Sequence, residues 1–72
     1  MEMLNAQFKK LRLERNLTQK QVADGLGIAE QAYQRYEYGK ITPSATVLIA
    51  LADFYNVSLD YLVGRSDIPE RR

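Results

Sequence analysis

The 72-residue sequence contains no cysteine and no histidine. Without cysteine, neither a disulfide nor a thiolate metal site can stabilise the fold. Without histidine, the commonest metal ligand and the commonest acid–base residue are both absent. We therefore expect a protein that uses no cofactor or metal, is not an enzyme, and depends on an apolar core for its stability.

Long apolar runs are also missing. No run approaches the ~20 residues of a membrane-spanning helix, and the N-terminal stretch MEMLNAQFKK lacks the apolar core of a signal peptide. The expectation is a cytoplasmic protein with no membrane segment. The length allows one small domain, which folds alone only if its local structure is well specified.

Net charge is low, at +1, but the basic residues are concentrated in one half of the chain. Residues 9–40 carry seven Lys or Arg against four Asp or Glu, which is a net +3. Residues 41–72 carry three against four, a net −1, and Glu2 completes the total. By itself this asymmetry is more typical of a solvated surface than of a binding site.

Apolar periodicity and capping residues predict five helices and no strand. Leu4, Phe8 and Leu11 recur at the i, i+4, i+7 spacing of an amphipathic helix. Thr18 and Gln21 form the capping box of a second helix, which Gly27 ends in a left-handed turn. The expected helices cover residues 5–15, 19–26, 30–38, 45–55 and 59–63.

Serine and glycine residues mark the ends of the later helices. Ser44 and Ser58 are suitable N-caps for the fourth and fifth helices, and Gly39 and Gly64 end the third and fifth. The fourth helix is expected to bury a stripe formed by Val47, Leu48, Leu51 and Phe54. Residues 66–72 contain a proline and mixed charges and are expected to form a short flexible tail.

The second and third helices are short and are joined only by the sequence LGIA. Neither would be stable alone, and so short a connection predicts a sharp crossing of the two helices. Ala23 is small enough to let them approach closely. The apolar positions that would face one shared core are Val22, Leu26, Ile28, Tyr33 and Tyr36. Such a unit is a helix-turn-helix.

The third helix has an outer face that a packing role does not explain. At about 100° per residue, Gln31, Gln34, Arg35 and Tyr38 fall on the side opposite Tyr33 and Tyr36. Glutamine and arginine are good helix formers and could be ordinary surface residues. In a helix-turn-helix, however, the same side chains suit hydrogen bonding to base edges.

Three stretches carry a family resemblance: LRLERNLTQKQVADGLG, RYEYGK and PSATVLIALADFYNVSLDYLVG. Across about residues 8–64 they resemble the lambda-repressor-like, XRE-type helix-turn-helix regulators of bacteria and phages. The resemblance implies an all-α fold, with a compact five-helix DNA-binding domain over residues 1–65 and helices 2 and 3 forming the helix-turn-helix. It also implies a transcriptional repressor that binds a palindromic double-stranded DNA operator as a homodimer, with helix 3 in the major groove.

Within this resemblance, base contacts are expected from Gln31, Gln34 and Arg35. Glu30 stays open, because it suits a helix N-terminus and would repel phosphate, yet could accept from a cytosine amine. Contacts to phosphate are expected from Gln19, Lys20, Tyr38 and Lys40. Lys9 and Lys10 are interpreted as charges that aid solubility.

The resemblance also implies a buried ion pair between Arg12 and Glu37. In the fifth helix Leu59 and Leu62 are expected to pack inward, which leaves Tyr61 or Val63 for a dimer contact that is weak without DNA. Two positions depart from the family pattern. Ala29 stands where Ser or Thr often caps helix 3, and Tyr33 replaces Ile or Val, so that its hydroxyl needs water or a partner.

Other functions fit the sequence less well. A protein-interaction module, such as an antitoxin-like partner, is the alternative, although the short tail leaves little room for a separate partner-binding segment. Stacking on single strands is disfavoured because Tyr33 and Tyr36 point to the core. No small-molecule ligand domain is apparent.

Overall fold

The computed structural model describes residues 4–70, and in this range it contains five α-helices and no strand. They are α1 (Leu4–Glu14), α2 (Gln19–Leu26), α3 (Glu30–Glu37), α4 (Ala45–Tyr55) and α5 (Leu59–Leu62). The five expected helices are confirmed, with bounds that differ by one residue at most. None of these helices is long and apolar enough to cross a membrane.

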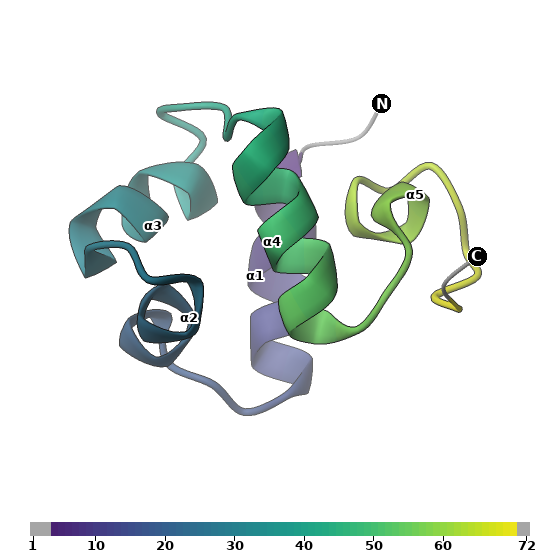
Figure 1. The fold of residues 1–72 in the computed structure, drawn as a ribbon, viewed down its shortest axis with the longest axis horizontal. Coiled ribbons are helices and arrows are strands. Elements are labelled where there is room, and N and C mark those ends of the chain that lie inside the picture. The colour runs from purple at the N-terminus through teal and green to yellow at the C-terminus, as the bar shows by residue number, and fades with distance from the viewer. Residues whose placement is uncertain (1–3, 71–72) are drawn as a thin grey trace.

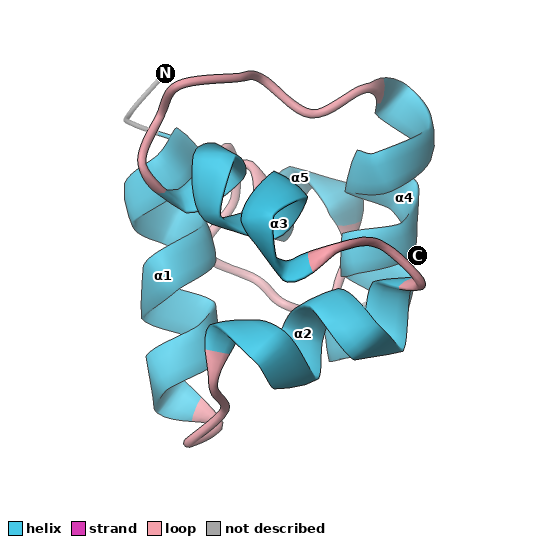
Figure 2. Ribbon diagram, turned by 90° about the vertical axis from the view of Figure 1, so that its left-hand side faces the viewer, coloured by secondary structure: helices cyan, strands magenta, loops and turns pink. Residues whose placement is uncertain are grey.

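The helix-turn-helix forms one side of the molecule. α2 and α3 pack on each other, α3 also packs on α1, and α2 also packs on α4. Figure 2 shows α2 and α3 in front, between α1 and α4, with α5 behind them. α3 and α5 therefore lie at opposite ends of the molecule (Figure 1).

Helix ends follow the capping residues of the sequence. The Thr18 hydroxyl accepts a hydrogen bond from the Gln21 amide at 3.0 Å, and the Gln21 side chain accepts one from the Thr18 amide at 2.8 Å. Gly27 ends α2 with φ of 73°, a left-handed conformation that glycine adopts without steric cost. Ala29 offers α3 no side-chain hydrogen bond, so this helix begins without a cap.

The core lies between all five helices and has Tyr33 as its largest fully buried side chain, with 0% exposure. Within the described part of the chain the ten buried apolar residues are Phe8, Leu11, Val22, Ala23, Tyr33, Leu51, Ala52, Tyr55, Val57 and Leu62. Leu26, Ile28 and Tyr36 are half-buried against this cluster. The expectation that the turn and both helices of the helix-turn-helix share one core is confirmed.

The expected orientation of α4 is wrong for Phe54. This residue is 36% exposed, while Leu51, Ala52 and Tyr55 are buried. The core-facing side of α4 is therefore turned toward Ala52 and Tyr55, and the Phe54 ring lies at its edge, against Gly25 of α2 and the ring of Tyr55. Alanine at position 52 was the missed indication, because a small residue in an apolar stripe lets neighbouring helices approach.

The expectation that Leu59 packs inward is also wrong. Leu59 is 44% exposed, whereas Val57 and Leu62 are buried in the core. Val57 precedes the N-cap Ser58, and the residue at this position often packs beneath the first turn of the helix. It therefore takes the inward place that we assigned to Leu59.

Candidate nucleic-acid interface

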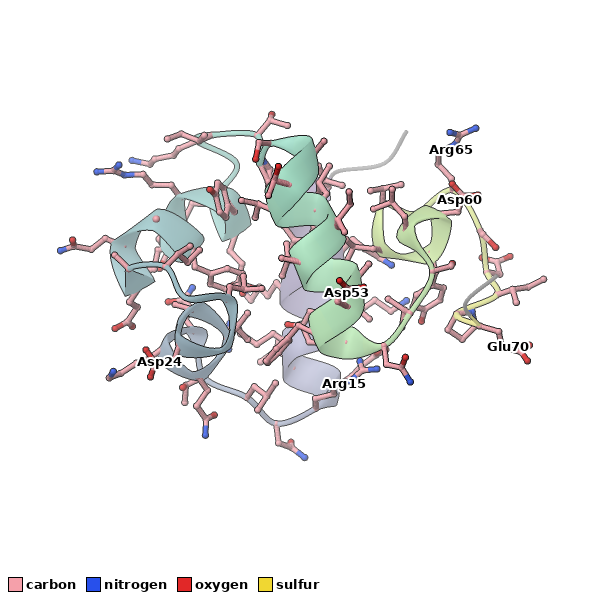
Figure 3. All side chains as sticks on the ribbon, viewed as in Figure 1. Arg15, Asp24, Asp53, Asp60, Arg65 and Glu70 are labelled. Atoms are coloured by element: carbon pink, nitrogen blue, oxygen red, sulfur yellow. The ribbon has the colours of Figure 1, made fainter. Side chains whose placement is uncertain are left out.

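The outer face of α3 is solvent-accessible along its length. Gln31 and Arg35 are exposed and Gln34 is half-buried, while Tyr38, just after the helix, is 60% exposed. In Figure 3 Asp60 and Glu70 lie at the end of the molecule opposite α3, and Asp53 lies on α4 between the two ends. The face with expected base contacts is thus spatially separated from Asp60 and Glu70.

α3 is fastened to α1 by a buried ion pair between Arg12 and Glu37. Arg12 Nε lies 2.6 Å from Glu37 Oε2, and Arg12 Nη2 donates to Glu37 Oε1 at 3.1 Å. The two side chains are only 12% and 1% exposed. Arg12 Nη1 also donates to the carbonyl of Leu17, at 2.9 Å. One guanidinium therefore connects α1, the turn before α2, and α3.

The charge of Glu37 is favoured by its partners. Burial alone would raise the pKa of this carboxyl, but the hydrogen bonds from Arg12 and Gln19 and the proximity of the Tyr33 hydroxyl lower it below its ordinary value of 4.5. Arg12 in turn has a raised pKa, chiefly because of its hydrogen bonds to Glu37. At neutral pH the pair is fully ionised.

Two of the expected DNA contacts are joined to this pair. Gln19 Nε2 donates to Glu37 Oε1 at 3.2 Å, and Gln34 Nε2 donates to Gln19 Oε1 at 3.2 Å. Gln34 Nε2 also donates to Glu30 Oε2 at 3.4 Å. The side chains of Arg12, Glu37, Gln19, Gln34 and Glu30 thus form one chain of hydrogen bonds, which we call the amide relay. Periodicity placed these residues on faces but did not indicate that they touch.

The residues expected to contact phosphate differ in their surroundings. Lys20 forms an exposed i, i+4 ion pair with Asp24, at 3.2 Å, which partly offsets its charge. Lys40 is exposed, and its backbone amide closes the end of α3 by donating to the Arg35 carbonyl at 2.9 Å. Its side chain therefore extends from a well-defined backbone position.

A shallow pocket of about 440 Å³ brings together Gln19 and Tyr38, two other candidates for phosphate contact. Its lining residues are Lys9, Arg12, Leu17, Thr18, Gln19, Glu30, Glu37 and Tyr38. Lys9 is therefore close to the expected interface. The sequence did contain an indication, because Lys9 precedes Arg12 by three residues and so lies on the same side of α1.

Among residues 4–70, two buried tyrosine hydroxyls make no hydrogen bond of regular geometry. These are the hydroxyls of Tyr33 and Tyr55, and burial is the main reason that the pKa of each is raised. The Tyr33 hydroxyl lies near Glu37 and Tyr55, but its geometry does not complete a hydrogen bond to either. Arg15, which sequence reasoning missed, donates to the Tyr55 carbonyl at 3.0 Å and lies 4.9 Å from the centre of its ring. Figure 3 shows Arg15 at the end of α1.

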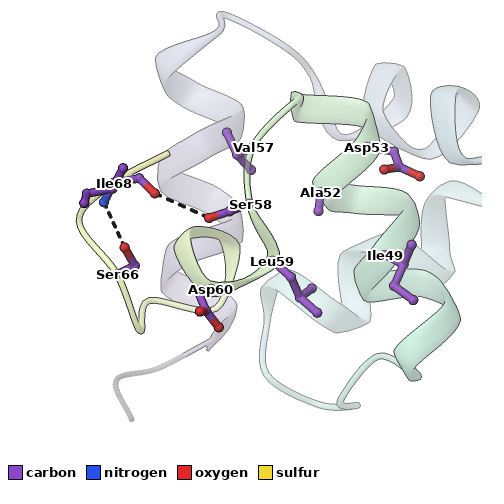
Figure 4. A pocket seen from close by; sticks show the side chains of 9 residues that line it. All are labelled: Ile49, Ala52, Asp53, Val57, Ser58, Leu59, Asp60, Ser66 and Ile68. Carbon is purple, nitrogen blue, oxygen red and sulfur yellow. Dashed lines mark hydrogen bonds between the residues drawn. The ribbon is translucent and has the colours of Figure 1, made fainter. Parts of the chain in front are cut away.

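A second hollow of about 480 Å³ lies between α4, α5 and the segment after α5 (Figure 4). It is lined by Ile49, Ala52, Asp53, Val57, Ser58, Leu59, Asp60, Ser66 and Ile68. The Ser58 amide donates to the Pro69 carbonyl at 2.8 Å, which holds this segment against α5. Tyr61 and Val63, the candidates for a dimer contact, are both half-buried. Among residues 4–70 no cluster of acidic side chains is arranged to hold a metal ion.

Comparison with known proteins places this geometry in a family. The chain is 43% identical over 61 residues to the HTH-type transcriptional regulator YqaE of Bacillus subtilis. The aligned region covers 85% of this chain and 53% of YqaE. The chain is also 37% identical over 65 residues to the cryptic phage CTXphi transcriptional repressor RstR of Vibrio cholerae, covering 90% of this chain and 59% of RstR. The chain thus spans little more than half the length of these relatives.

Solved structures share the fold. The P22 c2 repressor, crystallised with a synthetic operator, superposes with a TM-score of 0.81 over 92% of this chain and all of the P22 chain, at 20% identity. A transcriptional regulator from Listeria innocua gives a TM-score of 0.80 at 28% identity, covering 89% of this chain and 60% of that chain. Residues 8–62 match the family described as helix-turn-helix. With its five-helix, lambda-repressor-like fold, the chain belongs to the helix-turn-helix family.

Proposed function

We propose that this chain is a sequence-specific transcriptional regulator that binds double-stranded DNA with α3 in the major groove. The observation that carries the proposal is the polarity of α3. Tyr33 is fully buried on one side, while Gln31 and Arg35 are exposed on the other. In a helix-turn-helix the second helix enters the groove, and only the side chains on its outer face can reach the bases.

The expected contacts fall into two groups. Gln31, Gln34 and Arg35 are assigned to base edges, since arginine pairs with guanine and glutamine with adenine. Glu30 is the remaining base candidate and would accept from a cytosine amine. Gln19, Lys20, Tyr38 and Lys40 are assigned to the sugar–phosphate backbone, which positions the protein without specifying sequence.

Repression and dimerisation complete the proposal. The relative RstR is a transcriptional repressor, and we assign the same role to this chain, acting on a palindromic operator by occluding a promoter. α5 lies at the opposite end of the molecule from α3 (Figure 1), so a two-fold contact through Tyr61 and Val63 leaves both reading helices free. The exposed side chain of Leu59 adds apolar area to this end. The dimer is expected to be weak without DNA, because so small a patch buries little area.

Gel retardation on two kinds of DNA tests the base and phosphate roles. The specific probe is a duplex that the protein selects from a randomised pool, and the control is a scrambled duplex. Gln31→Ala or Arg35→Ala should lose about 1–3 kcal/mol on the selected duplex and relax the preference at one or two base pairs. Lys40→Ala should weaken both duplexes equally and reduce the salt slope by about one unit.

Two results would refute the proposal. If the protein selects no preferred sequence and retards no duplex at low salt, the alternative function is favoured, in which the chain binds a protein partner as an antitoxin does. Equal weakening of both duplexes by Gln31→Ala and Arg35→Ala would show that the outer face of α3 does not read bases. Sedimentation of a strict monomer, with one chain bound per full palindrome, would eliminate the dimer.

A further inference from the structure

Within the amide relay, Gln34, one of the residues assigned to base contact, is connected through Gln19 to a carboxylate that can only accept hydrogen bonds. Glu37 is ionised and 1% exposed, so the atom of Gln19 that faces it must be the NH2 group. The carbonyl oxygen of Gln19 is then the atom available to Gln34. Consequently Gln34 must also present its NH2 group to the relay, at 3.2 Å from Gln19 Oε1.

A second carboxylate imposes the same orientation on Gln34. Glu30, one turn earlier in α3, accepts from Gln34 Nε2 at 3.4 Å. A side-chain amide has two N–H donors, and in Gln34 one is directed to Gln19 and the other to Glu30. Within residues 4–70 the Gln34 carbonyl oxygen accepts no hydrogen bond. It is the part of the amide left for a ligand.

We propose that Glu37, acting through Gln19, fixes the amide of Gln34 so that it presents only its carbonyl oxygen to DNA. Gln34 then selects a base with an exocyclic amine in the major groove, which is adenine or cytosine. It rejects guanine and thymine at this position, because their groove edges offer acceptors there. Glu37 and Gln19 are positioning residues that contribute to specificity without reading a base. The inference rests on the proposed function, since it requires α3 in the major groove.

This reading differs from the usual pairing of glutamine with adenine. In the bidentate contact the glutamine oxygen accepts a hydrogen bond from adenine N6 and the glutamine nitrogen donates one to adenine N7. In this structure Gln34 Nε2 already donates to both Gln19 and Glu30. Forming the bidentate contact would break a hydrogen bond to Gln19 or to Glu30. The relay also leaves Gln19 Nε2 with one N–H to spare, which agrees with its assignment to phosphate.

The free protein tests the relay before any DNA is added. By NMR, the side-chain NH2 protons of Gln34 should exchange with water more slowly than those of Gln31, which is exposed on the same helix and outside the relay. Gln19→Ala should reduce that protection at Gln34, which then keeps only its hydrogen bond to Glu30, and leave Gln31 unchanged. Equal exchange of the Gln34 and Gln31 amides in the wild type would refute the relay whether or not the protein binds DNA.

Base analogues then test specificity on the duplex selected from the randomised pool. The position read by Gln34 is the one where Gln34→Ala relaxes the preference, and the selected base there should be adenine or cytosine. If it is adenine, 7-deazaadenine should bind within about two-fold of adenine, whereas purine, which lacks the N6 amine, should lose roughly 5- to 10-fold. For cytosine, 2-pyrimidinone replaces purine as the analogue without the amine. Both losses should vanish in Gln34→Ala.

Relay variants test the origin of this selectivity. In Gln19→Ala the Gln34 amide keeps its hydrogen bond to Glu30 but regains one free N–H, so sensitivity to 7-deazaadenine or tolerance of guanine and thymine should appear. Lys40→Ala, a phosphate variant outside the relay, should weaken binding without this change. In Glu37→Gln, the new amide gives its oxygen to Arg12 and its NH2 group to Gln19, which reverses the Gln19 amide and opposes the orientation that Glu30 imposes on Gln34. If circular dichroism shows this variant folded, its preference for adenine or cytosine should weaken.

Several results would overturn the inference while leaving the proposed function standing. One is the selection of guanine or thymine by the wild type at the base pair that Gln34 reads. Another is a loss of affinity on 7-deazaadenine equal to the loss on purine. The third is an unchanged base preference in both Gln19→Ala and a folded Glu37→Gln. Failure to select any sequence from the pool would instead refute the proposed function, and the inference with it.

Discussion

Replacing Glu37 with glutamine removes a buried charge while keeping the size of the side chain. In the wild type this carboxylate accepts three hydrogen bonds, two from Arg12 and one from Gln19. The variant keeps one oxygen acceptor, but it leaves the Arg12 guanidinium, only 12% exposed, without a counter-ion. We expect a marked loss of stability, because a buried charge without its partner is strongly unfavourable.

The structure sets the size of the effect. Breaking a buried pair from one side costs about 3–5 kcal/mol. The lower end applies here, since Arg12 retains some contact with water and its bond to the Leu17 carbonyl. For a domain of this length 1 kcal/mol corresponds to about 4–8 °C, so about 3 kcal/mol lowers the melting temperature by about 12–24 °C.

Thermal and urea unfolding, followed by circular dichroism, measure this loss. The matched control is Glu14→Gln, an exposed carboxylate at the end of α1 that should change the unfolding free energy by less than about 0.5 kcal/mol. The double variant Arg12→Met/Glu37→Leu should recover part of the stability, because apolar residues can replace a buried pair. If Glu37→Gln unfolds at the wild-type temperature, the pair does not stabilise the fold and the reasoning is wrong.

Three further changes test separate parts of the structure. Since the folded-state pKa of Glu37 is lowered, the stability it contributes is present above pH 4.5 and is lost as the pH falls through the lowered pKa. The difference in unfolding free energy between wild type and Glu37→Gln should therefore narrow below pH 4.5. A constant difference down to pH 2 would contradict this. Ala29→Ser supplies the missing cap of α3 and should add about 1 kcal/mol; a melting temperature no higher than that of the wild type would show that this end of α3 gains nothing. A Cβ at Gly25 would overlap the Phe54 ring. Gly25→Ala should therefore destabilise the wild type, yet stabilise the Phe54→Ala variant by up to about 1 kcal/mol, as measured by urea unfolding. Equal effects of Gly25→Ala in both backgrounds would exclude the contact.

Local chemistry made most of the fold predictable. Helix starts at Thr18, Ser44 and Ser58 and the left-handed end at Gly27 depend on hydrogen bonds within a few residues, so the sequence contains all that is needed to place them. The helix-turn-helix followed because LGIA is too short for any connection but a sharp crossing.

Rotation of a helix about its axis was harder to predict. Phe54 and Leu59 are both large and apolar, and periodicity alone assigned them to the core. Their places are taken by Ala52 and Val57, because the depth of each position depends on how closely α4 and α5 approach their neighbours. That distance is a property of the packed molecule and not of either helix.

The same limit applies to the candidate interface. Periodicity separated the outer face of α3 from its buried face, but it could not show that Gln34 is engaged by Gln19 and Glu30. Those contacts join residues from two helices whose relative placement is set by Ala23 and by the Arg12–Glu37 pair. Gln34 therefore lies on the accessible face of α3, but its NH2 group is already hydrogen-bonded within the protein.

Glu37 affects both the stability of the domain and its proposed specificity, whereas Gln19 affects the proposed specificity alone. Glu37 receives Arg12 on one side, which stabilises the fold, and Gln19 on the other, which orients the amide of Gln34. A change at Glu37 therefore acts on both properties. Gln19 has no part in the ion pair and is only half-buried, so Gln19→Ala should alter base preference at little cost in stability. A helix-turn-helix with this arrangement can change the base it selects by substitutions in α2, without altering any residue that contacts the base.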